Sequence, residues 1–388
     1  MEEAERLQKL PTYIFAKQDK LKAEARKRGM DLIDLGLGSP DIPPPQEVID
    51  EMILALKDPA NHRYPPFDGS HEFKQAVVNW VKKQYNVHVS EEEVVALIGS
   101  KEGLVHLQFA YINPGDSILV PMPAYPAHFR GTILAGGEPI VLPTTERTGY
   151  IPNLKIIDEA IARRAKMLIL SYPTNPTGAT ATKEFFEEAI AFAKKYDLIL
   201  LHDFAYAELY FDGQKPISIL SLPGAKDVAI EFHTMSKTFG MAGWRCGFAI
   251  GNAKYVESLR KIKTSLDYGL FAAVQKASIK ALTLTNDYMD RMRATYQKRR
   301  DLVVEGLNEL GWNIQKPKGA MYVWFPIPRG FNSYDWMIHL MEKTGVVITP
   351  GIAFGELGEG YARISLIEKE DKLKEVFARM KKAGIKYG

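Results

Sequence analysis

The sequence predicts an α/β fold in which a large domain holds a mostly parallel sheet covered by helices, with a smaller α+β domain beside it. The middle of the 388-residue chain alternates short continuous apolar runs with stretches of helical spacing. That alternation is typical of a parallel sheet buried on both faces. The chain is also too long for one ordinary core, which favours two domains.

The elements of the large domain are predicted in chain order from these two patterns. Helical spacing is found at residues 70–85, 100–112 and 183–196. Apolar runs of strand length are found at residues 92–99, 116–125, 164–173, 197–206, 228–236 and 244–251. We therefore place one continuous sheet domain at residues 46–284.

The last hundred residues change in character. A long charged helix is expected at residues 285–310, followed by a strand at 319–328, a helix, short strands at 346–351 and 361–367, and a terminal amphipathic helix. We predict that residues 285–388 join residues 1–45 in the small domain, because both stretches would flank the central sheet domain.

Composition excludes several classes of protein. A net charge of +3, with 50 basic and 47 acidic residues interspersed, does not favour binding to nucleic acid or to an anionic membrane. The single cysteine, Cys246, excludes an intramolecular disulfide framework and a cysteine-rich metal site. The first ten residues are charged and no apolar run reaches the length of a membrane span, so we expect a cytoplasmic location.

Polar side chains follow three successive strand-like runs. Asn175 comes after the run at 164–173, Asp203 ends the next run, and Thr234, Ser236 and Lys237 end the third. In an open parallel sheet, ligands bind beyond the carboxyl ends of the strands, so these side chains are expected to converge.

Asp203 is the most informative of these residues. It follows a run that should be buried on both faces, where a carboxylate needs a cation, several donors or a metal. The alternative is that Asp203 only caps the next turn. A metal is poorly supported, because no HExxH or Asp-x-Asp pattern accompanies it.

A phosphate site is predicted at "GSKEG", residues 99–103, where Gly99 and Ser100 begin a helix. The chain has neither a P-loop nor a complete G-x-G-x-x-G fingerprint. Arg245, eight residues after Lys237, adds a group that can bind the same phosphate through two hydrogen bonds. These residues require a ligand with a phosphate, a ring cation for Asp203 and a group that reacts with the amine of Lys237, and pyridoxal 5′-phosphate meets all three requirements.

The chain resembles the class I and II aminotransferases, the pyridoxal-phosphate enzymes of the aspartate aminotransferase fold. The resemblance is carried by "LGLGSPD", "YPPFDG", "GSKEG", "PAYP", "NPTG", "HDFAYAEL", "HTMSKTFGMAGWRCGF" and "ARISL", in that order and over nearly the whole length. Within that superfamily the chain is most similar to alanine (glutamate–pyruvate) transaminases, and LL-diaminopimelate aminotransferases are near relatives. The resemblance implies a sheet of the seven-stranded type and a homodimer with shared active sites.

The resemblance also implies a role for each matching residue. Lys237 would form a Schiff base with the cofactor and act with Asp203 and Tyr206 in catalysis. The cofactor would be held by Ser100, Lys101, Tyr125, Asn175, Asp203, Tyr206, Thr234, Ser236, Lys237 and Arg245, and by Tyr64 from the neighbouring subunit. The substrate would be held by Tyr13, Gly38, Asn175 and Arg363, the last of which would bind the α-carboxylate.

The expected activity is ping-pong transamination between an L-amino acid and a 2-oxo acid. Alanine and glutamate with pyruvate and 2-oxoglutarate are the preferred pairs, and LL-diaminopimelate or aspartate is the alternative. A second, distal carboxylate on the substrate would need another cation, for which Lys263 and Lys101 are hypotheses.

Two weaker readings change the chemistry. The first is a carbon–sulfur β-lyase, which shares the same lysine and aspartate. The second is a protein that only senses the cofactor, which would need a DNA-binding domain before residue 10. The N-terminal segment carries two aromatic residues, Tyr13 and Phe15, with two possible roles. They either fold over the site, with Gly36, Gly38 and Pro40 as the hinge, or only pack the N-terminal segment in place.

Overall fold

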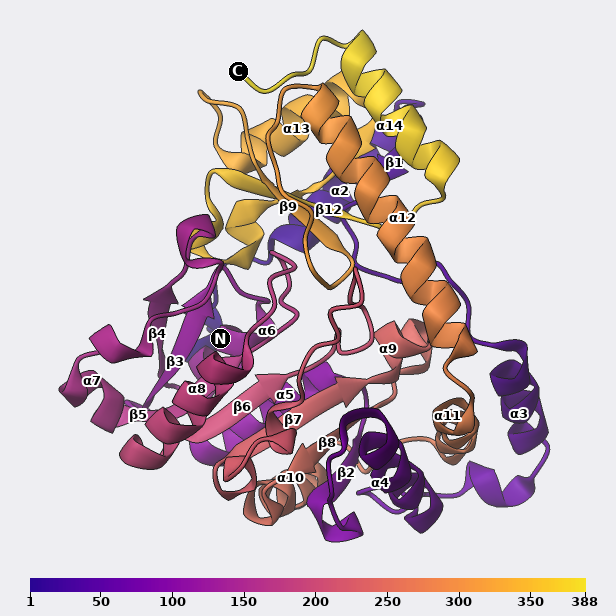
Figure 1. The fold of residues 1–388 in the computed structure, drawn as a ribbon, viewed down its shortest axis with the longest axis vertical. Helices are drawn as coiled ribbons and strands as arrows, with labels where there is room; N and C mark the ends of the chain where they lie inside the picture. Colours follow the sequence, from indigo (N-terminus) through magenta and orange to yellow (C-terminus); the bar gives the residue numbers. More distant parts are fainter.

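The computed structural model describes all residues from Met1 to Gly388 and is built around one seven-stranded sheet (Figure 1). The strand order is β2-β8-β7-β6-β5-β3-β4. Only β8 runs against the others, because it pairs antiparallel with both β7 and β2. The prediction of an α/β fold with a mostly parallel sheet is therefore confirmed.

The strands of this sheet are β2 (Val94–Leu97), β3 (Ser117–Met122), β4 (Glu138–Pro143), β5 (Ala165–Leu170), β6 (Ile199–Asp203), β7 (Ala229–Thr234) and β8 (Gly247–Gly251). Six of them lie inside the predicted apolar runs. The seventh, β4, was not predicted from the sequence. It is an edge strand that pairs only with β3 and contains Pro139 and Pro143, which an edge position tolerates.

The helices begin with α1 (Glu5–Gln8), α2 (Ile14–Lys27), α3 (Gln46–Leu56), α4 (His71–Tyr85), α5 (Ser100–Tyr111), α6 (Ala127–Leu134) and α7 (Glu159–Arg164). They continue with α8 (Lys183–Tyr196), α9 (Met235–Thr238), α10 (Ala253–Leu266), α11 (Ala272–Thr283), α12 (Asp287–Glu309), α13 (Ser333–Thr344) and α14 (Glu370–Lys382). The helices predicted at 70–85, 100–112, 183–196 and 285–310 are confirmed as α4, α5, α8 and α12. No helix is both long and apolar enough to traverse a lipid bilayer.

Helices cover both faces of the sheet, as the continuous apolar strands require. On one face, α4, α8 and α11 bury side chains such as Phe73, Phe186 and Ala277 against alternate strand residues. On the other face, α5, α6 and α10 do the same with Leu104, Phe129 and other apolar residues. Because helices cover both faces of the sheet, a ligand can reach the sheet only at the ends of its strands.

Polar caps fix where these helices begin. The Ser70 hydroxyl accepts a hydrogen bond from the backbone N–H of Phe73 at 3.1 Å, at the start of α4. Thr182 does the same for α8, and Asn252 for α10. A cap of this kind stabilises a helix by about 1 kcal/mol, which explains why the predicted starts of α4 and α8 match the structure. Helix α10 was not predicted from the sequence.

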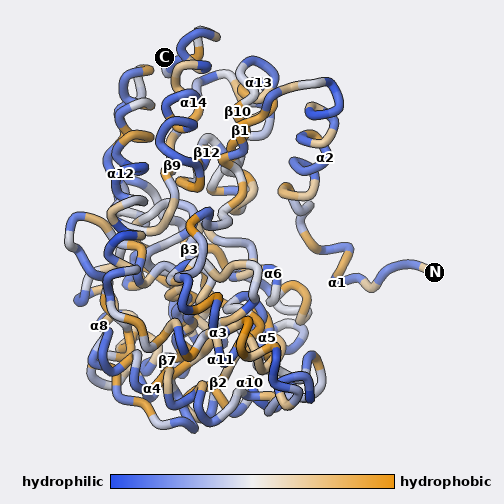
Figure 2. The backbone as a smooth tube through the Cα atoms, turned by 90° about the vertical axis from the view of Figure 1, so that its right-hand side faces the viewer, coloured by the Kyte–Doolittle hydropathy of each residue, from blue (hydrophilic) through white to orange (hydrophobic).

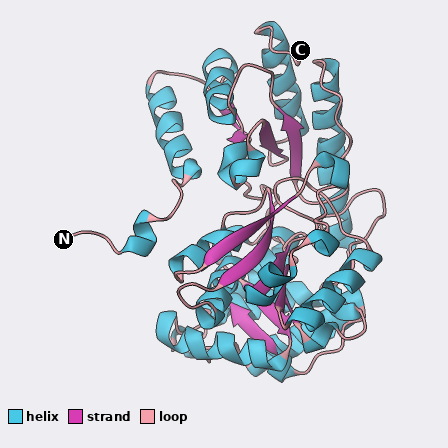
Figure 3. Cartoon of the chain, turned by 90° about the vertical axis from the view of Figure 1, so that its left-hand side faces the viewer, coloured by secondary structure: helices cyan, strands magenta, loops and turns pink.

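The C-terminal part holds a second sheet, β11-β12-β9, made of β9 (Tyr322–Pro326), β11 (Thr349–Pro350) and β12 (Tyr361–Ser365). The N-terminal segment joins this part, because β1 (Ile33–Asp34) pairs with β10 (Val346–Val347). In Figures 2 and 3, α2 lies beside this part, and the chain before α1 extends away from the body of the protein. The domain boundaries at 45/46 and 284/285 stay a prediction.

Candidate active site

A cavity of about 320 Å³ lies where the carboxyl ends of β6 and β7 face β9 and β12. Every residue to which the resemblance gives a role lines this cavity except Tyr64. The predicted residues in the lining are Tyr13, Gly38, Ser100, Lys101, Tyr125, Asn175, Asp203, Tyr206, Thr234, Ser236, Lys237, Arg245 and Arg363. Segments spread over 350 residues of the chain therefore meet at one cavity.

Lys237 is carried by α9, a single helical turn directly after β7. Thr234 ends the strand and caps this turn, because its hydroxyl accepts the backbone N–H of Ser236 at 3.2 Å. The Lys237 ammonium has no acidic partner and donates only to the backbone carbonyl of Gly38. Burial, followed by repulsion from Arg363 and Arg245, lowers the pKa of Lys237 to about 7. Near neutral pH, a large fraction of this amine is uncharged and nucleophilic.

This pKa makes a testable prediction for the protein without cofactor. Because only the neutral amine reacts, acetylation of Lys237 by a dilute amine reagent should rise through a midpoint near pH 7. Exposed Lys261 serves as the reference site for the extent of labelling. Peptide mass spectrometry after brief labelling measures both sites in one sample. A Lys237 midpoint near pH 10, the ordinary range of a lysine side chain, would contradict the prediction.

Asp203 ends β6 and is 4% exposed. Its Oδ2 lies 2.8 Å from Nε2 of His128, which must be the donor because an ionised carboxylate only accepts. Its Oδ1 accepts the backbone N–H of Ala205 at 3.3 Å, so Asp203 also caps the next turn. Both hypotheses drawn from the sequence are therefore partly right: Asp203 shapes the turn and also faces the cavity.

His128 was missed by the sequence reasoning. It lies on α6, three residues after Tyr125 in "PAYPAH", and its ring packs edge-on against the ring of Tyr125 at 5.7 Å. His128 is 3% exposed and fixes the orientation of the Asp203 carboxylate. The only sequence feature that relates His128 to the predicted site is its position three residues after Tyr125.

Arg363 is the most unusual charged group of the site. It is 2% exposed, and its guanidinium donates to Asn175 Oδ1 at 2.8 Å, to the Gly36 carbonyl at 2.6 Å and to Thr349 Oγ1 at 3.2 Å. None of these acceptors is charged, and the Arg363 Nε has no partner. A buried cation without an acidic partner is costly, so this group is complementary to an anionic ligand.

Tyr322 of β9 is a second residue that the sequence reasoning missed. Its hydroxyl lies 2.7 Å from the hydroxyl of Tyr206, and the Arg363 guanidinium lies 4.1 Å from the centre of its ring. A Cβ atom added to Gly38 would lie 2.3 Å from the Tyr322 hydroxyl, so that position admits only glycine. Tyr322 thus connects the predicted residues Gly38, Tyr206 and Arg363.

The other end of the cavity forms a cradle for an anion. Ser100 is the first residue of the 12-residue helix α5, whose free N–H groups carry partial positive charge. A Cβ on Gly99 would lie 2.4 Å from Arg245 Nη2, and one on Gly247 would lie 2.8 Å from the Ser100 amide nitrogen. Because neither glycine has a side chain, the Arg245 guanidinium and the N-terminus of α5 can both lie against the same part of the cavity. Arg245 donates to the Ala242 carbonyl at 2.8 Å and has no acidic partner.

The mouth of the cavity is formed by the N-terminal segment. Tyr13 packs against Phe15 at 5.4 Å between ring centres. The ring of Tyr13 also lies 6.0 Å from the Lys101 ammonium and 5.4 Å from the Arg130 guanidinium. Arg130 holds this segment by donating to the Pro11 carbonyl at 2.7 Å. Tyr13 and Phe15 therefore line the cavity and also pack the N-terminal segment in place. Movement of this segment about a hinge stays a prediction.

Two residues lie away from the cavity. Tyr64 is 87% exposed and packs edge-on against Tyr268 at 5.2 Å, on the outside of the protein. Lys263 is fully buried between Glu102 and Asp267, at 3.0–3.3 Å from their oxygens. The hypothesis that Lys263 binds a distal carboxylate is therefore wrong, because two acidic groups already occupy its ammonium.

The cavity fits pyridoxal phosphate on four independent grounds. It offers an uncharged amine, a buried carboxylate, an anion cradle and, at the opposite end, a buried cation for a second anion. Lys237 would bond to the aldehyde, Asp203 would face the ring nitrogen, and Ser100, Ser236 and Arg245 would hold the phosphate. Such a site defines a pyridoxal-phosphate enzyme that acts on carboxylate-bearing amines.

Comparison with known proteins identifies the family. The family "Aminotransferase class I and II" matches residues 30–380, and the chain belongs to it. An LL-diaminopimelate aminotransferase of Halothermothrix orenii is 49% identical over 388 residues, which is 100% of both chains. Further relatives at 43% to 48% identity carry the same enzyme name.

Solved structures agree with this assignment. Substrate-bound BacF of Bacillus subtilis superposes with a TM-score of 0.97 at 36% identity, covering 100% of this chain and 99% of BacF. A Thermus thermophilus aspartate aminotransferase superposes with a TM-score of 0.92 at 28% identity, covering 99% and 100%. The protein is an aminotransferase that uses pyridoxal phosphate.

Proposed function

We propose that this aminotransferase transfers an amino group between LL-diaminopimelate and a 2-oxo acid such as 2-oxoglutarate. The proposal replaces the preference for alanine and glutamate drawn from the sequence. The observation that carries it is full-length similarity, at 49% identity, to a protein named for that substrate. Transamination by a pyridoxal-phosphate enzyme is common to both readings.

The charges around the cavity support a substrate with more than one carboxylate. Arg245 faces the phosphate cradle and Arg363 the opposite end, and neither pairs with an acidic side chain. Lys101 at the mouth also lacks an acidic partner, and burial lowers its pKa. One cationic group therefore remains after a phosphate and an α-carboxylate are matched, and a second carboxylate would use it.

The residues of the site perform distinct tasks. When bound, pyridoxal phosphate supplies the electron sink that stabilises negative charge at the substrate α-carbon. Asp203, held by His128, would keep a proton on the ring nitrogen of the bound cofactor. Arg363 binds the α-carboxylate through its two-pronged guanidinium and orients the α-carbon. Lys237 would accept the proton from that carbon and return it.

The substrate assignment is tested by half-reactions. Purified, cofactor-loaded protein is mixed separately with LL-diaminopimelate, meso-diaminopimelate, L-alanine, L-glutamate and L-aspartate, and loss of the visible absorbance is followed by stopped flow. We expect the largest second-order rate constant with LL-diaminopimelate. The meso isomer is the matched control, because it differs only in the configuration of one carbon. A larger constant for alanine would overturn the substrate and leave the aminotransferase class intact.

We also propose a homodimer in which each site borrows Tyr64 from the partner. Apolar side chains are exposed on α3 at Ile53, Leu54 and Leu56, and the Tyr64–Tyr268 pair is exposed beside the loop that follows α3. Exposed apolar side chains of this kind favour association between copies.

Shared sites predict complementation between two damaged proteins. Tyr64→Ala should lower kcat/KM about 10-fold by removing one hydrogen bond to a charged phosphate. Lys237→Ala should be nearly inactive. A refolded equimolar mixture forms hybrids in which one of two sites has both intact groups, so activity should recover to about a quarter of wild type. Activity equal to the simple average of the two variants would contradict sharing of Tyr64.

A further inference from the structure

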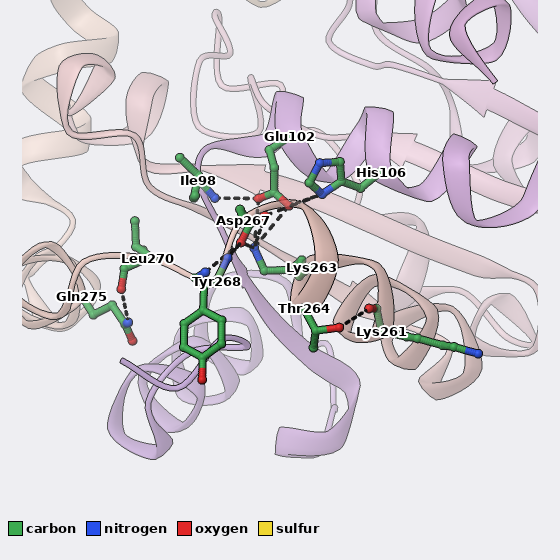
Figure 4. A network of polar contacts seen from close by, with 11 residues as sticks. Ile98, Glu102, His106, Lys261, Lys263, Thr264, Asp267, Tyr268, Leu270 and Gln275 are labelled. Carbon is green, nitrogen blue, oxygen red and sulfur yellow. Dashed lines mark hydrogen bonds and ion pairs between the residues drawn. The ribbon is translucent and has the colours of Figure 1, made fainter. Parts of the chain in front are cut away.

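A buried cluster lies beside the phosphate cradle, centred on Lys263 of α10 (Figure 4). The Lys263 side chain is fully buried, and its ammonium contacts both oxygens of Glu102 and both oxygens of Asp267, at 3.0–3.3 Å. His106 of α5 lies at the edge of the cluster, with Nδ1 2.7 Å from Glu102 Oε1. None of these four residues lines the cavity of the active site.

Glu102 connects this cluster to the phosphate cradle. Its Oε2 accepts the backbone N–H of Ile98 at 2.7 Å, directly before the turn that leads into α5. That turn places Gly99 against Arg245 and delivers Ser100 and Lys101 to the cavity. The position of the Glu102 carboxylate therefore determines where the cradle begins.

Asp267 connects the cluster to the outer surface. Its Oδ1 accepts the backbone N–H groups of Tyr268 at 2.8 Å and Gly269 at 2.7 Å. Tyr268 has φ of +123°, a conformation that side-chain-bearing residues rarely adopt, so this turn depends on Asp267 to hold it. The ring of Tyr268 packs on Tyr64, the residue that we propose reaches the partner subunit.

A metal ion is the obvious alternative for this cluster. Ligand atoms of Glu102, His106 and Asp267 lie within 4.8 Å of one another, which is compatible with a metal. The Lys263 ammonium, however, already lies among the carboxylate oxygens. An ion at that place would face a positive charge at contact distance, so the ammonium acts as the cation of the cluster.

We propose that Lys263 is a positioning residue for the phosphate cradle. Its ammonium neutralises the carboxylates of Glu102 and Asp267 together. The turn at Ile98 and the turn at Tyr268 are therefore fixed relative to each other. Without it, two largely buried carboxylates would face each other and move apart, and each would displace the backbone N–H groups that it accepts. Lys263 thereby sets the affinity for phosphate without touching it.

The test uses inorganic phosphate as the probe and the protein freed of cofactor. Isothermal titration calorimetry should show that Lys263→Met weakens phosphate binding by about 10-fold or more. The triple variant Glu102→Gln, Lys263→Met, Asp267→Asn should bind within about 3-fold of wild type. Its amide oxygens still accept from Ile98, Tyr268 and Gly269, and no uncompensated charge remains. Lys261→Met, at an exposed position two residues away, is the matched control.

The outcomes separate a positioning role from a purely structural one. Wild-type phosphate affinity in Lys263→Met, together with a lower melting temperature, would overturn the proposal. So would equal weakening in the single and triple variants, because the defect would then not arise from unbalanced charge. Where the single variant does not fold, the triple variant decides: affinity near wild type supports the proposal, and a loss of 10-fold or more overturns it.

Discussion

Replacing Lys237 by alanine is expected to lower kcat by about 10⁴-fold, the upper range for a positioned general base. The amine that moves the proton at the substrate α-carbon is then gone. Lys101, the other lysine of the cavity lining, lies at the mouth beside Tyr13. The fold should persist, because Lys237 makes one hydrogen bond, to the Gly38 carbonyl, and has no acidic partner.

The measurement is steady-state turnover of the proposed substrates, LL-diaminopimelate and 2-oxoglutarate, together with thermal unfolding. Without cofactor, the melting temperature of Lys237→Ala should equal or exceed that of wild type, since a desolvated amine is removed. Lys261→Ala, which changes an exposed lysine of α10, should retain wild-type turnover. More than a tenth of wild-type activity in Lys237→Ala would remove Lys237 from the mechanism.

Replacing Arg363 by methionine is expected to reduce kcat/KM by about 10³-fold for the amino acid and for the 2-oxo acid alike. Both substrates carry the α-carboxylate that Arg363 would bind. Methionine retains much of the buried apolar volume, so the loss reports on the guanidinium. Arg363→Lys should lie between methionine and wild type, because it keeps the charge and loses the two-pronged geometry.

A substrate without the carboxylate makes this prediction specific. A simple alkyl diamine should react slowly with wild type and equally slowly with Arg363→Met. The preference for LL-diaminopimelate over the diamine should therefore largely disappear in the variant. An unchanged KM for the 2-oxo acid would show that the α-carboxylate binds elsewhere.

The parts of the site that follow strands were predictable from the sequence. Asn175, Asp203 and Lys237 each follow a continuous apolar run, and parallel strands bring their carboxyl ends to one edge. Arg363 was reached only through the resemblance of "ARISL", since nothing in its own strand distinguishes it from a salt-bridged arginine.

Other residues gave no usable signal. Tyr322 lies in an apolar strand where burial alone explains an aromatic residue. His128 and Asp203 are 75 residues apart, and no local pattern joins them. The hypothesis that Lys263 binds substrate failed for the same reason, because one of its two acidic partners, Glu102, is 161 residues away. Strand β4 was missed because its two prolines break the pattern expected of an interior strand.

The unpaired basic groups of the cavity also bear on how substrates arrive. The whole chain carries a formal charge of only +3, yet Lys101, Arg245 and Arg363 gather around one concave, low-dielectric space without acidic partners. Such a concave cluster focuses field lines outward and draws anions from solution. Dicarboxylates should therefore be captured faster than neutral amino acids at low ionic strength. Salt should erase that advantage as the screening length falls to about 8 Å.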